Sequence, residues 1–172
     1  RAAEHGHLEI LKALLDAVAA VDKRNPDTGT FPLLMAAQNG HVEVVKALLE
    51  RNASVDQDDA IQGHFPLLLA AEHGHVEIVK VLVEAGAAVD KRNPRIGGLL
   101  LFLAAENGSV EVVKLLLSHK ADPYQRLNED GLSVVESAVL NNHDDIIRTL
   151  CDHLDLTPEE LRESSGINDI PF

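Results

Sequence analysis

Histidines are the residues whose types and spacing most readily suggest chemistry in this sequence. Two pairs flank a glycine, in His5-Gly6-His7 and in His73-Gly74-His75. Imidazole is the commonest zinc ligand in proteins, so each pair could contribute to a metal site. The second histidine of each pair, however, belongs to a series that also contains His41 and His143. A structural role explains such a series more simply, and we expect no metal and no cofactor.

The single cysteine, Cys151, is the other candidate for chemistry. A thiol acts as a nucleophile when a base and oxyanion donors stand beside it, and no pattern around Cys151 supplies them. Cys151 instead takes the place that Leu48-Leu49 and Leu116-Leu117 hold elsewhere, which predicts a buried thiol. Ile96-Gly97-Gly98 lacks the Lys and the Ser or Thr of a phosphate-binding loop. We therefore predict that the chain is not an enzyme.

Charge and composition narrow the classes of partner. The chain has 172 residues, a formal net charge of -13, only 3% aromatic residues and no tryptophan. Nucleic acid and anionic lipid repel such a chain, and the usual stacking platforms for single strands are lacking. No apolar run reaches the roughly 18 to 20 residues that a membrane helix needs. A lone cysteine fits a reducing compartment, so we expect an intracellular protein, cytoplasmic or nuclear, that binds neither nucleic acid nor membrane.

A repeat of 34 residues organises the chain. The pattern Ala-Ala-x-x-Gly is followed by His or Ser, then by Val or Leu, then by Glu, and its glycines are Gly6, Gly40, Gly74 and Gly108. One further step reaches Asn142, in a degenerate fifth copy. The period suits tetratricopeptide repeats and also slightly lengthened ankyrin repeats, so the residues inside the repeat have to distinguish the two.

Two copies open with nearly the same residues, Phe31-Pro32-Leu33-Leu34-Met35-Ala36-Ala37 and Phe65-Pro66-Leu67-Leu68-Leu69-Ala70-Ala71. Proline suits the first turn of a helix, and the glycine after each segment suits the left-handed residue that ends it. These segments resemble the ankyrin opening Thr-Pro-Leu-His-x-Ala-Ala, and Ala53-Ser54-Val55-Asp56 resembles the family's lead into its finger. The resemblance implies an all-α ankyrin-repeat solenoid of stacked helix-turn-helix units with β-hairpin fingers, about 4.5 to 5 repeats long.

The same register predicts the boundaries of the array. We expect a partial first repeat at residues 1–21, full repeats at 22–55, 56–89 and 90–123, and a degenerate capping repeat at 124–153. Thr157-Pro158-Glu159-Glu160 has the N-cap, the proline and the acids of one short helix within residues 154–172. Arg1 falls in the middle of a first helix, so we expect the natural protein to extend further toward its N-terminus.

The sequence differs from the family pattern at several positions, and these differences lead to further predictions. The family's Thr and His, which hydrogen-bond neighbouring repeats, are replaced by Phe31 and Leu34, by Phe65 and Leu68, and by Leu99 and Phe102. We expect the three phenylalanines and Leu99 to be mostly buried between repeats. Each finger is one residue longer than in the family pattern. The resemblance also implies that the histidine after each glycine braces the loop and caps the second helix.

A stacked array commits its helices to packing and exposes its finger tips and first-helix ends. The resemblance therefore implies a non-catalytic protein-interaction module or scaffold, expected to be a monomer, that binds another protein on its concave finger and first-helix face. The alternative is a targeting or regulatory domain of a longer enzyme or host-directed effector whose catalytic part lies outside this chain. The binding face implied by the family's contact positions consists of Lys23, Arg24, Asp27, Thr30, Gln38, Asn39, Gln57, Asp58, His64, Glu72, His73, Lys91, Arg92, Arg95, Glu106, Asn107, Gln125 and Arg126.

Charge alternates along the predicted fingers. Lys23-Arg24 and Lys91-Arg92 with Arg95 are basic, whereas Asp58-Asp59 and Glu129-Asp130 are acidic. Repeats stack at about 10 Å, so we expect the two basic tips about 20 Å apart, with the acidic finger between them and little packed against either. An acidic segment of a partner would gain register and association rate from such a line. Random finger charge is the alternative that the sequence leaves open.

Overall fold

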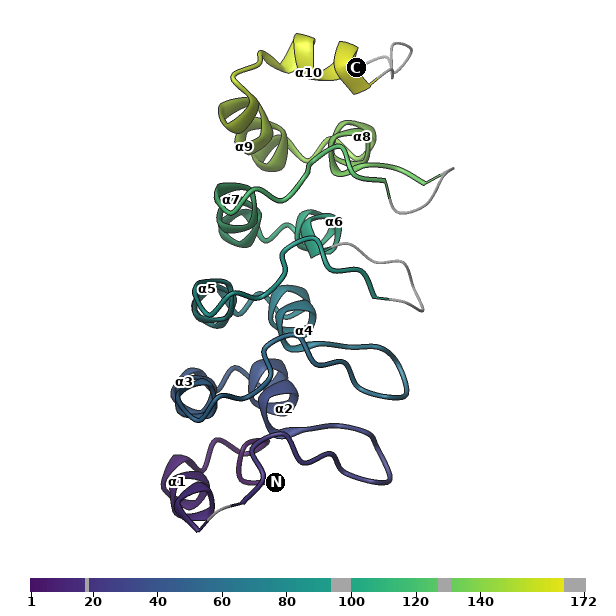
Figure 1. Ribbon diagram of the computed structural model, residues 1–172. Coiled ribbons are helices and arrows are strands. Elements are labelled where there is room, and N and C mark those ends of the chain that lie inside the picture. Colours follow the sequence, from purple (N-terminus) through teal and green to yellow (C-terminus); the bar gives the residue numbers. More distant parts are fainter. Residues whose placement is uncertain (18, 94–99, 127–130, 166–172) are drawn as a thin grey trace. The chain divides into compact units, whose positions relative to one another are not determined.

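The computed structural model describes residues 1–17, 19–93, 100–126 and 131–165. These residues form pairs of short helices joined by loops, an all-α repeat fold (Figure 1). The contacts divide the chain into two compact units, unit 1 with Arg1–Ala88 and Asn93–Arg95, and unit 2 with Val89–Arg92 and Ile96–Phe172. Unit 1 holds α1 (Leu8–Asp16), α2 (Pro32–Gln38), α3 (Val42–Glu50), α4 (Pro66–Glu72) and α5 (Val76–Glu84). Unit 2 holds α6 (Leu100–Glu106), α7 (Val110–Ser118), α8 (Val134–Leu140), α9 (Asp144–Leu154) and α10 (Pro158–Ser165).

The first helix of a repeat begins and ends where the sequence pattern predicts. Phe31 and Phe65 are extended, with φ of -138° and -132°, and the proline after each one starts α2 or α4. The first turn of a helix leaves its N–H groups without helical partners, so proline is tolerated there. Gly40 and Gly74 follow the two helices with φ of 77° and 69°. Asn142 adopts the same left-handed conformation at 52° in the fifth copy, and asparagine tolerates it better than most residues.

Apolar side chains of the first helices form the core of unit 1. Helix α2 packs on α3 and on α4, and α4 packs on α5. Leu33, Leu34, Leu67 and Leu68 are almost completely buried by these contacts. Full burial of such a side chain contributes roughly 1.5 to 3 kcal/mol. Helices of seven residues are too short to be stable alone, so this packing is what stabilises them.

The expected burial of the phenylalanines is confirmed in unit 1, where Phe31 is 2% exposed and Phe65 is 0% exposed. Phe102 of unit 2 is buried less completely than these two, with an intermediate exposure. Phe102 takes the position that Leu34 and Leu68 hold in the earlier repeats, and its larger ring is consistent with incomplete burial at a position that elsewhere holds Leu. Leu99 lies outside the described residues.

The last repeat carries polar groups at the two positions that Phe and Leu take in unit 1. Ser133 is the N-cap of α8 and Glu136 lies in its first turn, and both are buried. The Ser133 N–H donates to Glu136 Oε2 at 2.7 Å, and the Glu136 N–H donates to Ser133 Oγ at 3.2 Å. Burial alone would raise the pKa of Glu136, but the hydrogen bonds from Ser133 and the charge of Arg126 outweigh it and lower the pKa.

An aspartate in each of three repeats binds the backbone of the next. Asp22 accepts hydrogen bonds from the Ser54 N–H at 3.1 and 3.2 Å and from Ser54 Oγ at 2.6 Å. One repeat later, Asp56 accepts from the Ala88 N–H at 3.1 and 3.3 Å. In unit 2, Asp90 accepts from the Asp122 N–H at 3.3 Å. We call these three contacts the carboxylate braces; sequence analysis missed them, although aspartate recurs every 34 residues.

The histidines after the glycines point back to the preceding repeat. His41 Nε2 donates to the carbonyl of Glu4 at 2.9 Å, and His75 Nε2 donates to the carbonyl of Gln38 at 3.0 Å. Neither side chain caps its own helix, so that part of the expectation is wrong. The ring of His41 also lies against Gly6, where an added Cβ would come within 2.7 Å of Nδ1. Glycine is therefore required at position 6 by space as well as by its positive φ.

The C-terminal helix of the described residues packs on the last repeat. Helix α10 contacts α8 and α9, and Leu161 is completely buried there. The Thr157 N–H donates to Glu160 Oε2 at 2.8 Å, and the Glu160 N–H donates to Thr157 Oγ1 at 3.2 Å, which caps the helix. The hydrogen bonds from Thr157 lower the pKa of Glu160.

A left-handed residue also follows helices α3, α5 and α7, and a different amino acid occupies the position in each. Asn52, Gly86 and Lys120 stand at equivalent positions with φ of 59°, 90° and 68°. Glycine adopts this conformation without strain, whereas lysine pays about 1 to 2 kcal/mol because its Cβ approaches the backbone.

We therefore predict that Lys120→Gly raises the free energy of unfolding by about 1 kcal/mol. Gly86→Ala is the matched opposite change, because nothing lies within 4 Å of an added Cβ and only the backbone conformation opposes it. It should lower the free energy by about 1 kcal/mol. Urea unfolding measures both values, and a Lys120→Gly protein no more stable than the original would contradict the strain at this position.

Candidate functional site

The predicted binding face is built on finger 1 (residues 22–30) and finger 2 (residues 56–64) in unit 1. A backbone hydrogen bond closes each loop, from the Asn25 N–H to the Thr30 carbonyl and from the Asp59 N–H to the His64 carbonyl, each at 2.7 Å. The described residues do not include every finger of the chain, and the β-hairpin form of the fingers stays a prediction.

Arg24 is the best-anchored basic residue of finger 1. Its Nη1 donates to the Gly29 carbonyl at 3.4 Å, and its guanidinium lies 5.5 Å from the centre of the Phe31 ring. With the Gln57 amide turned so that its oxygen faces Arg24, that oxygen accepts from Nε at 3.0 Å and from Nη2 at 3.1 Å. Arg24 therefore joins finger 1 to finger 2, while its neighbour Lys23 is exposed.

Asp59 organises finger 2 from inside. Its side chain is buried and accepts the N–H groups of Ile61 at 2.9 Å, Gln62 at 2.5 Å and Gly63 at 3.1 Å. His64 Nδ1 lies 3.4 Å from the other carboxylate oxygen. Burial alone would raise the pKa of Asp59, but the three backbone donors and His64 outweigh it and lower the pKa. Asp59 is thus a structural residue and not part of an acidic fingertip.

The ends of the first helices carry side chains that are held in place. Asn39 Nδ2 donates to the Met35 carbonyl at 2.8 Å, and His73 Nδ1 donates to the Leu69 carbonyl at 2.9 Å. Both side chains cap the carbonyl four residues earlier in the chain. The rings of His73 and His75 are nearly parallel, with centroids 5.9 Å apart. His73 therefore has a fixed orientation at an exposed edge of unit 1.

Unit 2 carries the other predicted residues. Arg92 Nη2 donates to the Arg126 carbonyl at 2.8 Å, and Arg126 Nη1 donates to the Gly131 carbonyl at 3.0 Å. Arg126 also forms an ion pair with Glu136. The contact of Arg126 with a carbonyl five residues later repeats that of Arg24 with Gly29.

The residues predicted for the binding face differ in the exposure of their side chains. The exposed ones are Lys23, Arg24, Asp27, Asn39, Glu72, His73, Arg92, Glu106, Asn107 and Arg126. The half-buried ones are Thr30, Gln38, Gln57, Asp58, His64, Lys91 and Gln125. Arg95 lies outside the described residues. Residues Lys91, Arg92, Glu106, Asn107, Gln125 and Arg126 belong to unit 2, and the others belong to unit 1.

Two exposed leucines of unit 2 were missed by the sequence analysis. Leu132 is 37% exposed and takes the position of Thr30 and His64, and Leu140 is 40% exposed and takes the position of Gln38. A comparison of the copies position by position would have revealed them, because apolar residues stand there in place of polar ones.

A protein-family model described as ankyrin repeats (3 copies) matches residues 1–93 and 89–160. The chain belongs to the ankyrin repeat family. No curated protein matches the chain. Ankyrin repeats are generally protein–protein interaction modules, and the family is typically non-catalytic.

The expectation that the ankyrin finger tips pack against little is wrong for the arginines. Arg24 contacts finger 2 and the Phe31 ring, and Arg92 binds the backbone of Arg126. A variant with both Arg24 and Arg92 reversed in charge would disturb folding as well as recognition. The line of basic, acidic and basic fingers involves residues of both units and stays a prediction.

The histidines and Cys151 are the side chains of this ankyrin chain that the sequence analysis considered as metal ligands or as a nucleophile. In the part of the chain that the structure describes, no three His, Cys, Asp or Glu side chains come together as a metal site. Cys151 is buried, as the sequence predicts, and burial together with the nearby Asp152 raises the pKa of its thiol. None of the helices in the described residues is both long enough and apolar enough to span a bilayer.

Alanine substitutions of Arg24 and of Lys23 test which of these two finger residues stabilises the fold. Arg24→Ala should lower the free energy of unfolding by about 1 kcal/mol, because it removes a guanidinium that contacts Gln57, Gly29 and the Phe31 ring. Lys23→Ala is the neighbouring control and should change it by less than about 0.5 kcal/mol. Equal effects in urea unfolding would show that the contacts of Arg24 contribute nothing.

Because the pKa of Asp59 is lowered in the folded protein, we predict that its contribution to the free energy of unfolding depends on pH. Asp59→Ala should lower the free energy of unfolding at pH 7 by about 1 to 3 kcal/mol, since three backbone N–H groups, one of them buried, lose their acceptor. Because the folded pKa is lowered, the contribution is complete above the ordinary value of 3.8 and is lost as the pH falls through the folded pKa. The difference in free energy of unfolding between the original protein and the Asp59→Ala protein should therefore become smaller at acidic pH. A constant difference from pH 7 down to strongly acidic pH would contradict this account.

Proposed function

We propose that the chain is a non-catalytic module that binds a partner protein through the finger and first-helix face. The observation that supports the proposal most is the different use of the two helices of each repeat. Val44, Leu48, Ile78 and Leu82 of α3 and α5 are 0% to 2% exposed, so the second helices are committed to the core. The fingers and first-helix ends carry exposed polar side chains of both charges.

The partner segment that fits this face is acidic and partly apolar. Lys23 is an exposed cation on finger 1, and Arg92 and Arg126 are exposed cations of unit 2. Because the whole chain carries -13, these cations stand out locally and would favour an acidic segment over the rest of the surface. Leu132 and Leu140 add exposed apolar area of the kind that anchors interfaces. We also propose that the protein is a monomer and that it is intracellular, in the cytoplasm or in the nucleus.

A targeting or regulatory role within a longer enzyme or effector is the second candidate. The same face would then bring an attached catalytic part to its target. The two candidates differ in whether the chain alone accounts for the biological effect, and comparing the activity of the chain alone with that of a longer protein containing it tests this directly.

The face is tested by exchanging two charges on finger 1 without changing the net charge. Lys23→Glu combined with Asp27→Lys should weaken binding of the partner protein at least about tenfold, through slower association and a reduced salt dependence. Both residues are exposed, so folding should be unaffected. Surface plasmon resonance at several salt concentrations measures the effect on a partner identified by crosslinking to the original chain.

A matched control lies on the second helix α5. Lys80→Glu with Glu84→Lys exchanges two exposed charges at the same spacing of four residues and should leave binding unchanged. If the α5 exchange weakened binding and the finger exchange did not, the partner would contact the second helices and the proposed face would be wrong.

A further inference from the structure

The tip of finger 2 carries an exposed apolar side chain that the sequence analysis did not single out. Ile61 is 49% exposed, and fingers 1 and 2 contain no other Val, Leu, Ile, Met or Phe. The equivalent residue on finger 1 is Asp27, which is also exposed. A single exposed isoleucine is ordinary on a protein surface, so its surroundings decide whether it can act as an anchor.

Hydrogen bonds hold the backbone around Ile61 in one conformation. The Ile61 N–H donates to Asp59 Oδ1 at 2.9 Å, and the N–H groups of Gln62 and Gly63 donate to the same buried carboxylate. The completely buried Asn93, which belongs to unit 1, donates from Nδ2 to the Gln62 carbonyl at 3.1 Å. Because the backbone is already ordered, covering Ile61 costs little further conformational entropy.

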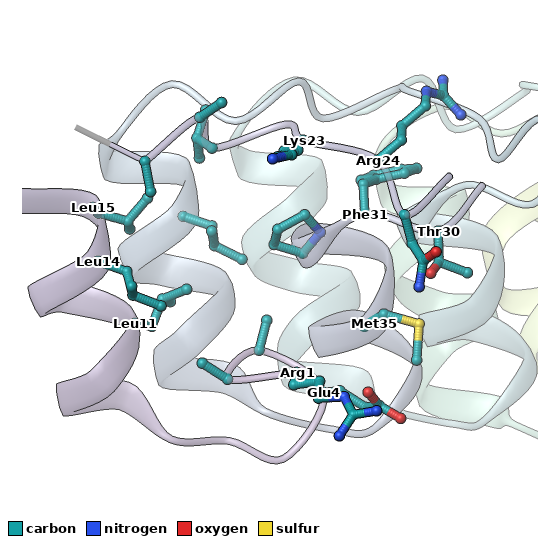
Figure 2. A pocket seen from close by; sticks show the side chains of 18 of the residues that line it. Arg1, Glu4, Leu11, Leu14, Leu15, Lys23, Arg24, Thr30, Phe31 and Met35 are labelled. Atoms are coloured by element: carbon teal, nitrogen blue, oxygen red, sulfur yellow. The ribbon is translucent and has the colours of Figure 1, made fainter. Parts of the chain in front are cut away.

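Finger 1 packs directly on this tip. A Cβ added to the buried Gly29 would lie 3.2 Å from the backbone nitrogen of Ala60, the residue before Ile61. The carbonyl of the same glycine accepts from Arg24 Nη1 at 3.4 Å. Figure 2 shows Arg24 next to Phe31, and its guanidinium lies 5.5 Å from the centre of that ring. Arg24 and Ile61 therefore flank the place where the two fingers touch.

The positive charge of Arg24 is fixed in direction by neutral groups. Within the described residues, the Gly29 carbonyl, the Gln57 amide oxygen and the Phe31 ring hold its guanidinium. None of these three groups carries a charge, and the side chain of Arg24 is exposed. A carboxylate that replaces water there gains a charge-assisted hydrogen bond from a donor whose orientation is already set.

We propose that Arg24 and Ile61 form a two-point site for one short segment of the partner protein. In that segment an apolar side chain packs on Ile61, and a carboxylate a few residues away pairs with Arg24. The site lies within the finger and first-helix face, so it rests on the function proposed above. Burial of Ile61 supplies affinity, and the carboxylate sets the register of the segment.

Peptides selected on the original chain from a random library displayed on phage are the probe. They should combine Leu, Ile or Phe with Asp or Glu a few residues away. In fluorescence anisotropy, Ile61→Ser should weaken binding of a selected peptide at least about tenfold, whereas Ile61→Leu should retain it. Val76→Ser is the matched control and should leave the affinity unchanged, because Val76 is 41% exposed at the start of the second helix α5.

The carboxylate contact is tested from the side of the peptide, which leaves the contacts of Arg24 within the chain intact. Replacing the acidic residue of the peptide by its amide should weaken binding to the original chain at least about fivefold. The same replacement should have no effect on binding to an Arg24→Gln protein, shown to be folded by urea unfolding. An equal loss in both proteins would overturn the pairing with Arg24.

Further outcomes separate this site from the proposed face. Peptides that lose affinity in the Lys23→Glu and Asp27→Lys exchange but not in Ile61→Ser would overturn the site and leave the face. Peptides that lose affinity only in the α5 exchange would overturn both. A dimer of the original chain in sedimentation that Ile61→Ser dissociates would also overturn the site, because a second copy would then cover Ile61.

Discussion

The contact between successive repeats is the constraint on which the rest of the structure depends. First helices of seven residues and second helices of nine or eleven cannot hold their own conformation in water, and each buries its apolar face only against neighbours. Leu34 and Leu68 are buried in this way. The apolar positions of α2 to α5 are therefore fixed by packing, and the outward side chains are left to vary. That division leaves the fingers and the ends of the first helices to form the binding face that we propose.

Polar contacts at the loops set the register of this packing. The carboxylate braces join residues 32 positions apart, and the histidines reach back 37 positions to a carbonyl of the repeat before. Each contact satisfies a backbone group that the end of a short helix or loop leaves without a helical partner. In unit 1 an apolar Phe and Leu pair takes the two positions where the last repeat has Ser133 and Glu136, which hydrogen-bond to each other at the start of α8.

The repeat period predicted much of this from the sequence, because it identifies equivalent positions. It located the left-handed Gly40 and Gly74, the buried Phe31 and Phe65, and Cys151 in the core. It could not give the direction in which a side chain points, since that depends on groups 30 or more residues away. His41 was therefore expected to cap its own helix. For the same reason Arg24 was expected to pack against little, although its guanidinium contacts Gln57 of the next finger.

Amide hydrogen exchange in a Phe65→Ala protein tests most directly whether neighbouring repeats stabilise one another. Phe65 precedes α4, and α4 packs on α2 of the preceding repeat. The account predicts that the amides of α2 lose protection together with those of α4, because neither helix is stable without the other. Loss of protection confined to α4, with α2 exchanging as slowly as in the original protein, would contradict it.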